Sequence, residues 1–250
     1  MGSEMCIRDR VSIMWRRKRG LCRLSRRIKC DTCSKNIVRS GSSPDDLTIV
    51  HSDPWLLVVL KPSGLLSQPG RGSHLQDSLI TRLQRWSDDH HLVHRLDRDT
   101  SGLVLVARGL DSLRRCSDLF AARRVNKLYE AEVVGQLQGR GRIDSCLARL
   151  DRDPPRYGDH PEGRPSTTLW RVRARQPNST QLWLRPLTGR SHQLRAHLAG
   201  IGHPIVGDPI YGETSTTPMR LHARALGFEH PFTGRRLRVS TRQEDVPHAS

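Results

Sequence analysis

The stretch His94-Arg95-Leu96-Asp97-Arg98-Asp99-Thr100-Ser101-Gly102 is the part of the sequence from which the fold can best be predicted. It lies between two apolar runs, Leu92-Val93 and Leu103-Val104-Leu105-Val106-Ala107, and a polar block in this position predicts a tight connection between two strands. Gly102 can adopt the positive φ that a sharp turn needs. The connection would hold Asp97 at the rim of a sheet, where the local pattern alone fits a turn former or a surface ion pair as well as a functional acid.

Outside this block the sequence predicts more strands than helices. Residues 135–165 are rich in Gly, Arg and Pro, and we expect loops there around one short strand near Ile143. Regular βαβ alternation is missing, which favours an α+β fold with a mixed, largely antiparallel sheet and flanking helices. Apolar or alternating runs predict strands at 47–50, 55–60, 128–134, 168–174 and 181–184, and helical spacing appears at 79–86, 113–120 and 191–198.

Short polar residues mark the expected starts of two of these helices. Asp77 or Ser78 is positioned to cap the helix at 79–86, and Thr188 or Ser191 the helix at 191–198. Side-chain oxygens at such positions accept hydrogen bonds from free backbone N–H groups of the first turn.

Six separated motifs occur in an order that resembles the RluA-type pseudouridine synthases. The block 94–102 resembles the HRLDxxTSG signature of that family, and the motifs together cover roughly residues 47 to 240. The resemblance is nearest to the subgroup that acts on 23S ribosomal RNA and on tRNA anticodon stem-loops, because KPSGLLSQPGR and the helix after it look like that subgroup. The other five motifs are LKPSGLL (60–66), KLYEA (127–131), PLTGRSHQLR (186–195), GHPIVGD (202–208) and LHA (221–223).

The resemblance implies a pseudouridine synthase fold and a cofactor-free reaction in which uridine is detached at N1, turned, and rejoined to the same ribose carbon through C5. It implies that Asp97 is the catalytic residue, as a nucleophile or as a base at the sugar. Arg195 would pair with Asp97 and keep it ionised, although taken alone an arginine there equally fits a phosphate contact. Tyr129 would stack on the uracil and take part in proton transfer at C5, although a strand tyrosine by itself fits a core position.

A second set of residues would bind the substrate, because the target nucleotide must swing out of its stack to reach an enzyme site. Arg95 resembles the residue that relatives use near the vacated position, where its guanidinium can stack. The remaining members of this set are expected to support the site or contact the RNA backbone; they are Leu96, Arg190 and His192.

Two other functions fit parts of the sequence. A basic protein that binds or chaperones RNA without catalysis would explain the charge, but it would not need Asp97, Tyr129 and Arg195 together. A metal-dependent hydrolase built on His90, His91 and His94, or on the pair 192 and 197, would need carboxylates at catalytic-metal spacing, which the sequence lacks. We therefore expect no metal and no cofactor.

Composition restricts the partners and the compartment. The formal net charge of +17 and a pI near 10.9 favour an anionic partner, with RNA as the first candidate. The six cysteines show no disulfide-framework spacing, which favours a reducing compartment and hence the cytoplasm. No apolar run approaches the ~20 residues of a membrane helix, so no membrane association is expected. We expect a monomer without an obligate protein partner.

The charge is concentrated at the N-terminus. Residues 1–42 hold 12 Lys and Arg against 3 Asp and Glu, whereas the rest of the chain holds 30 against 22. This segment lacks hydrophobic periodicity and is interpreted as a basic extension that is disordered or not native, since Met1–Arg10 resembles translated adapter sequence. Cys30 and Cys33 form a CxxC without a second pair at zinc-site spacing. The catalytic domain is predicted at residues 43–250.

Overall fold

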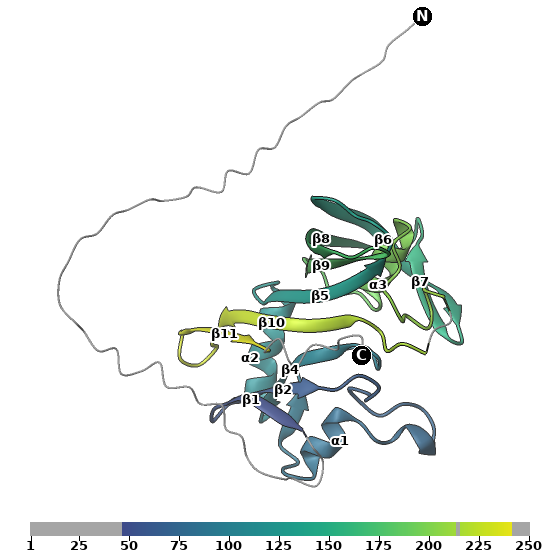
Figure 1. Cartoon of the computed structure of the whole chain (residues 1–250). Coiled ribbons are helices and arrows are strands. Elements are labelled where there is room, and N and C mark those ends of the chain that lie inside the picture. Colours follow the sequence, from purple (N-terminus) through teal and green to yellow (C-terminus); the bar gives the residue numbers. More distant parts are fainter. Residues whose placement is uncertain (1–46, 214–215, 242–250) are drawn as a thin grey trace, which may run out of the picture. The chain divides into compact units, whose positions relative to one another are not determined.

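The computed structural model describes residues 47–213 and 216–241 (Figure 1). The predictions for residues 1–42, Cys30 and Cys33 included, lie outside the described residues. None of the helices in the described ranges has the length and apolar character needed to cross a bilayer. The strands are β1 (Thr48–Ser52), β2 (Leu56–Lys61), β3 (His90–Leu92), β4 (Ser101–Arg108), β5 (Asn126–Val134), β6 (Arg140–Arg152), β7 (Pro155–Asp159), β8 (Arg164–Arg175), β9 (Ser179–Pro186), β10 (Leu221–Glu229) and β11 (Arg236–Ser240). The helices are η1 (Ser73–Leu75), α1 (Leu79–Gln84), α2 (Leu110–Ala121) and α3 (Gln193–Gly200).

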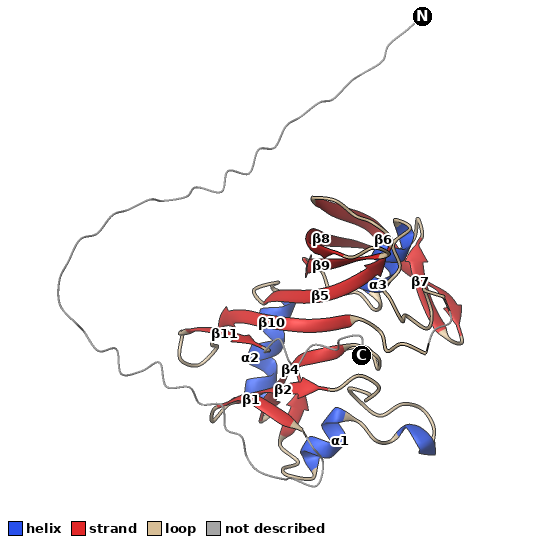
Figure 2. Ribbon diagram, in the orientation of Figure 1, coloured by secondary structure: helices blue, strands red, loops and turns tan. Residues whose placement is uncertain are grey.

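All the strands described belong to one sheet, with helices packed on it (Figure 2). Their order is β1-β2-β4-β10-β5-β9-β8-β6-β7, with β3 beside β4 and β11 beside β10. Only the pairing of β4 with β10 is parallel; the other pairings of named strands are antiparallel. The predicted α+β fold with a mixed, largely antiparallel sheet is confirmed. In Figure 1, β10 runs through the middle of the sheet, between the β1–β2–β4 part with α1 and the β6–β9 part with α3.

The parallel contact of β4 with β10 explains the glycine that ends the 94–102 block. Gly102 has φ 117°, and a Cβ at this position would lie 2.5 Å from the backbone nitrogen and oxygen of Ala223 in β10. The prediction of a positive φ is therefore confirmed, but Gly102 lies inside β4 and not in the turn. Its lack of a side chain allows the two central strands to approach each other just behind the Asp97 loop.

Alternate residues of the central strands contribute to two different core layers. Val104 of β4 packs with Leu83 of α1 on one face of the sheet. Leu105 of β4 packs with Leu119 of α2 on the other face, and all four side chains are buried. Because side chains of a strand alternate between faces, a strand covered by a helix on each side reads as a continuous apolar run. This is why β2 and β4 were predictable from sequence.

The helix starts follow the prediction in one case and depart from it in the other. Ser78 caps α1, one of the two residues predicted to do so. Neither Thr188 nor Ser191 caps α3; the N-cap residue is His192, in the left-handed region with φ 53°. The first turn is tied down instead by Gln193, whose side-chain oxygen accepts a hydrogen bond of 2.7 Å from the Thr188 hydroxyl. The left-handed residue turns the chain sharply and brings the His192 side chain toward Asp97.

The prediction of loops around one short strand at 135–165 is wrong. β6 spans 13 residues, β7 follows it, and β8 begins at Arg164. β6 is paired along its length, with β8 from Arg140↔Arg171 to Leu147↔Arg164 and with β7 on its other side. Its sequence carries arginines and small polar residues rather than alternating apolar ones, because much of this part of the sheet is exposed to solvent. The strand is therefore defined by pairing between distant segments, which a local hydrophobic pattern does not reveal.

Candidate active site

The loop that carries Asp97 is anchored by residues that end β2 or follow it. The Ser67 hydroxyl donates to the carbonyl of Leu96 at 2.7 Å and accepts from the Leu96 backbone N–H at 3.1 Å. The Lys61 side chain, which is fully buried, donates to the carbonyl of Arg98 at 2.9 Å. Burial lowers the pKa of Lys61 to about 8, against the opposing effect of nearby carboxylates. Asp97 is therefore held between two anchored neighbours, which fixes the direction of its side chain.

A row of three charged side chains leads from the loop into the interior. Arg195 Nη1 lies 3.3 Å from Asp97 Oδ2. The same guanidinium donates through Nε and Nη2 to both carboxylate oxygens of Asp208, at 2.7 Å each. Arg195 and Asp208 are 2% and 0% exposed, whereas Asp97 is 28% exposed. The bidentate pair fixes the guanidinium and presents one remaining N–H to the accessible carboxylate of Asp97.

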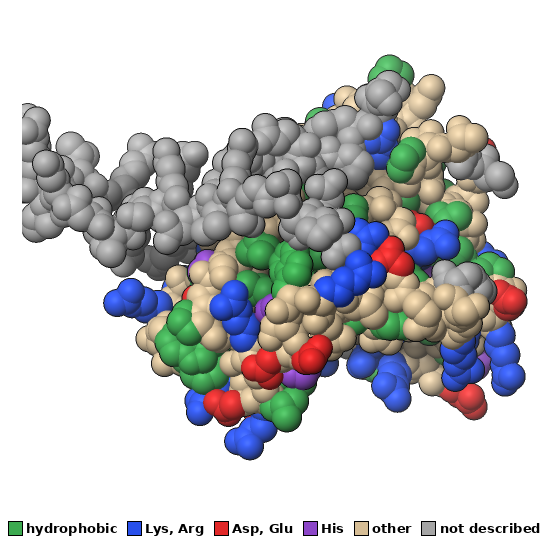
Figure 3. All heavy atoms as spheres, turned by 90° about the horizontal axis from the view of Figure 1, so that it is seen from below, with side chains coloured by type: hydrophobic (Ala, Val, Ile, Leu, Met, Phe, Trp, Pro, Cys, Tyr) green, Lys and Arg blue, Asp and Glu red, His purple; other side chains and the backbone are tan. Residues whose placement is uncertain are grey.

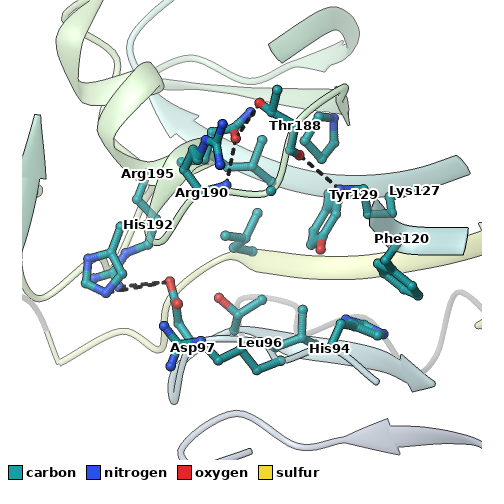
Figure 4. A pocket seen from close by; sticks show the side chains of 17 residues that line it. His94, Leu96, Asp97, Phe120, Lys127, Tyr129, Thr188, Arg190, His192 and Arg195 are labelled. Carbon is teal, nitrogen blue, oxygen red and sulfur yellow. Dashed lines mark hydrogen bonds and ion pairs between the residues drawn. The ribbon is translucent and has the colours of Figure 1, made fainter. Parts of the chain in front are cut away.

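His192 also points toward Asp97, as Figure 4 shows. Its Nε2 lies 3.9 Å from Asp97 Oδ2, and its Nδ1 lies 3.2 Å from the Tyr211 hydroxyl. That hydroxyl accepts a 2.7 Å hydrogen bond from the backbone N–H of Tyr157, so its own proton is free to be donated to Nδ1. Burial lowers the pKa of His192, although the charge of Asp97 opposes this effect. These contacts favour a neutral imidazole with its proton on Nε2, facing Asp97.

A cavity of about 310 Å³ opens beside Asp97, and Tyr129 of β5 lines it. Figure 4 shows Tyr129 and Asp97 reaching into this cavity from different segments of the chain. Burial, followed by the charge of Asp97, raises the pKa of Tyr129, so its phenol stays protonated at neutral pH. The volume is at the lower end of the range for small-molecule pockets and suits one planar base.

The structure brings together every residue that the sequence analysis assigned to the site. Leu96 is 6% exposed and forms an apolar part of the wall. Arg95 is exposed at the rim, where Nη2 donates to the Ser191 hydroxyl at 3.3 Å. Arg190 donates through Nε to the carbonyl of Pro165 at 3.4 Å. The seven predicted residues that line the one cavity are Arg95, Leu96, Asp97, Tyr129, Arg190, His192 and Arg195.

The histidines that suggested a metal site have other contacts. The ring of His90 lies 3.0 Å from the carbonyl of Leu83 through Nδ1. His94 Nε2 accepts a 2.9 Å hydrogen bond from the backbone N–H of Leu105. Within residues 47–213 and 216–241, His90, His91 and His94 do not form a group of metal-ligating side chains, and no other three His, Cys, Asp or Glu residues do so. The described geometry therefore gives no support to the hydrolase alternative.

His197 stabilises the helix that carries Arg195. Its ring is 2% exposed, and Nε2 lies 3.0 Å from the Ser145 hydroxyl and 2.8 Å from the Ser166 hydroxyl, so that α3 is joined to β6 and β8. Burial lowers the pKa of His197 to about 4, against the opposing charges of two aspartates. Because the unfolded chain then binds a proton that the folded chain does not, this residue makes folding less favourable as the pH falls below about 6.5.

We predict that acidification from pH 6.5 to 4 lowers the free energy of unfolding, with roughly 2 to 3 kcal/mol of the loss due to His197. The variant His197→Gln, whose amide can keep hydrogen bonds to the two serines, should show a shallower pH dependence by that amount. Urea unfolding across this pH range checks the prediction. Identical slopes for the two proteins would contradict it.

Several residues near the site were not assigned from the sequence, and three of them have notable contacts. Asp208 ends the quoted GHPIVGD motif, and Lys61 begins the KPSGLL segment, but neither received a role. Tyr211 lies three residues after Asp208 and has its pKa raised to about 12, mainly by burial. The sequence did carry a signal for two of them. Lys61 ends an apolar strand, and Asp208 follows an apolar run and a glycine. A charged residue at such a position is buried only when it has a partner.

The fold and the site, with one accessible carboxylate beside a cavity of base size, fit the class of enzymes that act on a nucleobase. Comparison with known sequences agrees with this class. The RNA pseudouridylate synthase family matches residues 55–200, more than half of the chain. The chain therefore belongs to the RNA pseudouridylate synthase family, and it is an isomerase of that enzyme class.

Individual relatives refine this assignment. The dual-specificity RNA pseudouridine synthase RluA of Pasteurella multocida is 38% identical over 203 residues, which cover 78% of this chain and 93% of the relative. The RluA of Vibrio parahaemolyticus is 40% identical over 194 residues, covering 73% of this chain and 78% of the relative. Among solved structures, human RNA pseudouridylate synthase domain containing 1 aligns with a TM-score of 0.69 at 29% identity, covering 81% of this chain and 85% of that one. The RluA-type resemblance seen in the six motifs and the predicted pseudouridine synthase fold are both confirmed.

Proposed function

We propose that the chain converts specific uridines of ribosomal RNA, tRNA or both into pseudouridine, with Asp97 as the catalytic residue and without a cofactor. The observation that carries this proposal is the convergence of Asp97, Tyr129 and Arg195 on one cavity of base size. The curated relatives support the substrate class, since they are named dual-specificity RNA pseudouridine synthase or ribosomal large subunit pseudouridine synthase D. The finer targets that we propose are 23S ribosomal RNA and the tRNA anticodon stem-loop.

The chemistry uses each of the three residues in a different way. The Asp97 carboxylate acts at the ribose, either by attacking C1′ as the bond to N1 breaks or by removing a proton from the sugar. The base turns within the cavity, and C5 bonds to C1′ as the bond between Asp97 and C1′ breaks or, on the other route, as the proton returns to the sugar. C5 then loses its hydrogen as a proton, and N1 gains one. Arg195 keeps the carboxylate ionised while the base excludes water. Tyr129, with its raised pKa, acts as a stacking surface and as a protonated phenol that donates or relays a proton.

An RNA partner also agrees with the surface. On the face drawn in Figure 3, Lys and Arg side chains are spread widely and Asp and Glu are fewer. We also propose that the enzyme acts as a monomer. Substrates of this class support a cytoplasmic location.

The test is tritium release from RNA labelled at C5 of uridine, with total RNA from a host that lacks such enzymes as the substrate. C5 loses its hydrogen only when the new carbon–carbon bond forms, so release reports the complete isomerisation. We expect release by the purified chain in the presence of a chelator. No release from a folded protein that binds the same RNA would favour the alternative of an RNA-binding protein without catalysis.

Tyr129→Phe is predicted to lower single-turnover release by about 10² to 10⁴-fold, the range for loss of a proton-transferring group, with little change in RNA affinity. The phenyl ring preserves stacking, so only the hydroxyl is lost. Tyr129→Ala should in addition weaken binding by about 1 to 3 kcal/mol, because it removes the stacking surface. Equal turnover by the phenylalanine variant and the unmodified enzyme would limit Tyr129 to stacking.

We propose that residues 43–250 form the catalytic unit. The family match at 55–200 and the described elements from β1 to β11 support this boundary. Deletion of residues 1–42 is predicted to leave the rate of tritium release at saturating RNA within about twofold. A collapse of that rate in a truncated protein with unchanged thermal stability would assign the basic segment a role in catalysis.

A further inference from the structure

A second cavity of about 370 Å³ adjoins the catalytic one and is lined by cations without carboxylates. Arg123 lies in the turn between α2 and β5, Lys127 in β5, and Arg190 before α3. No Asp or Glu lines this cavity. Within residues 47–213 and 216–241 the side chain of Arg123 makes no hydrogen bond or ion pair. Like charges gathered without neutralisation oppose folding, so such a cluster is expected to have an anionic partner.

The two cavities share a common wall. Lys127 and Arg190 line both, together with Phe120, Thr188 and Gly189. The Lys127 ammonium donates to the carbonyl of Thr188 at 2.9 Å, which leaves two of its three N–H groups for other acceptors. Gly189 leaves this ammonium uncovered, because a Cβ there would lie 3.6 Å from Nζ. Figure 4 shows Lys127 and Tyr129 next to each other at this wall.

Lys127 and Arg123 also affect each other electrostatically. Burial lowers the pKa of Lys127, and the charge of Arg123 lowers it further. An anion between the two side chains would remove this repulsion and would favour the charged form of Lys127. The anion that must lie next to a base bound in the first cavity is the phosphodiester of the same strand.

We propose that the second cavity is a phosphodiester subsite, in which Arg123, Lys127 and Arg190 hold one of the two phosphates that flank the target uridine. The inference rests on the proposed function for the occupant of the first cavity. It assigns Arg123 as a positioning residue for the RNA strand that touches no reacting atom. A phosphate bound there fixes the ribose relative to Asp97 and so orients C1′ for attack.

The probe is the trinucleotide UpUpU, whose central uridine carries a phosphodiester on its 5′ side and another on its 3′ side. Two analogues each carry one uncharged methylphosphonate, at one linkage or the other. Binding to the full chain is measured at low salt by titration calorimetry. We expect the unmodified protein to lose about tenfold in affinity for one of the two analogues, the scale of a charged hydrogen bond, and little for the other.

The informative variant is Arg123→Asn. Arg123 has φ 56°, a conformation in which asparagine is one of the better tolerated residues, so the variant should fold normally. It is expected to bind UpUpU about tenfold more weakly and to have lost the discrimination against the sensitive analogue. Arg123→Lys should retain most of the affinity for UpUpU and most of the discrimination against the sensitive analogue, because it keeps the charge. The matched control is Arg238→Asn in β11, which removes an exposed arginine that lines neither cavity and should change neither quantity.

The inference is overturned if Arg123→Asn discriminates between the analogues as the unmodified protein does, or if no binding of UpUpU is detected at low salt. Its failure can be distinguished from failure of the proposed function. Tritium release with no effect of Arg123→Asn on analogue binding would leave the isomerase and reject the subsite. Loss of analogue discrimination in Arg123→Asn, in a protein that releases no tritium, would support the phosphate-binding cavity and reject the proposed isomerase activity.

Discussion

Asp97→Asn is expected to abolish tritium release, with a loss of about 10⁴-fold or more, the scale seen when a reacting group is removed from an enzyme. The amide keeps the shape of the side chain and can still accept a hydrogen bond from Arg195 Nη1, which lies 3.3 Å from Oδ2. It can neither attack C1′ nor take a proton from the sugar. RNA affinity should stay within about threefold, because the loop anchors at Lys61 and Ser67 do not involve the carboxylate.

The matched control lies two residues away in the same loop. Asp99 pairs with Arg98 at 3.2 Å and does not line the catalytic cavity. Asp99→Asn makes the same chemical change with the same loss of charge, and it should leave release within a few fold. Comparable losses of tritium release in both variants would show that the charge or the rigidity of the loop matters, and not a reacting carboxylate at Asp97. Strong residual turnover by Asp97→Asn would refute its assignment directly.

Sequence predicted the site residues better than it predicted how they are held. The seven assigned residues converge on one cavity because each lies in a motif whose order along the chain resembles a known family. Asp208 was missed because its contact with Arg195 joins positions 13 residues apart through a bend that only the folded chain creates. His192 was assigned, but its left-handed backbone was not foreseen, because local pattern favoured a side-chain cap at Ser191 or Thr188.

In the fold, too, local sequence pattern predicts some elements, while others depend on contacts that form only in the folded chain. β2 and β4 are buried on both faces, and their continuous apolar runs predict them as strands. β6 and β8 are held by a long antiparallel ladder with partly exposed faces, and β6 carries no comparable signal, whereas part of β8 was predicted at 168–174. Their stability depends on pairing between residues that are far apart in the chain, which propensity and periodicity do not measure.

Breaking the buried ion pair of Arg195 and Asp208 is expected to lower both stability and activity. Arg195→Met would leave Asp208, 0% exposed, with its charge and with only the backbone N–H groups of Ile210 and Tyr211 as hydrogen-bond donors. Breaking a buried ion pair from one side typically costs about 3 to 5 kcal/mol. We expect a loss of this size in the free energy of urea unfolding, together with loss of tritium release, because Asp97 loses its cation.

The double variant Arg195→Met with Asp208→Asn separates the structural role of the pair from its catalytic role. With neither charge present, no unpaired ion remains in the interior, and the amide oxygen introduced by Asp208→Asn can still accept from the two backbone N–H groups. The double variant should therefore be more stable than the sum of the single variants predicts, by about 1 to 3 kcal/mol, the range for coupled contacts. Tritium release should nevertheless stay lost, since no cation faces Asp97. Additive losses in stability would show that the two side chains act independently, and recovered turnover would show that Asp97 does not depend on Arg195.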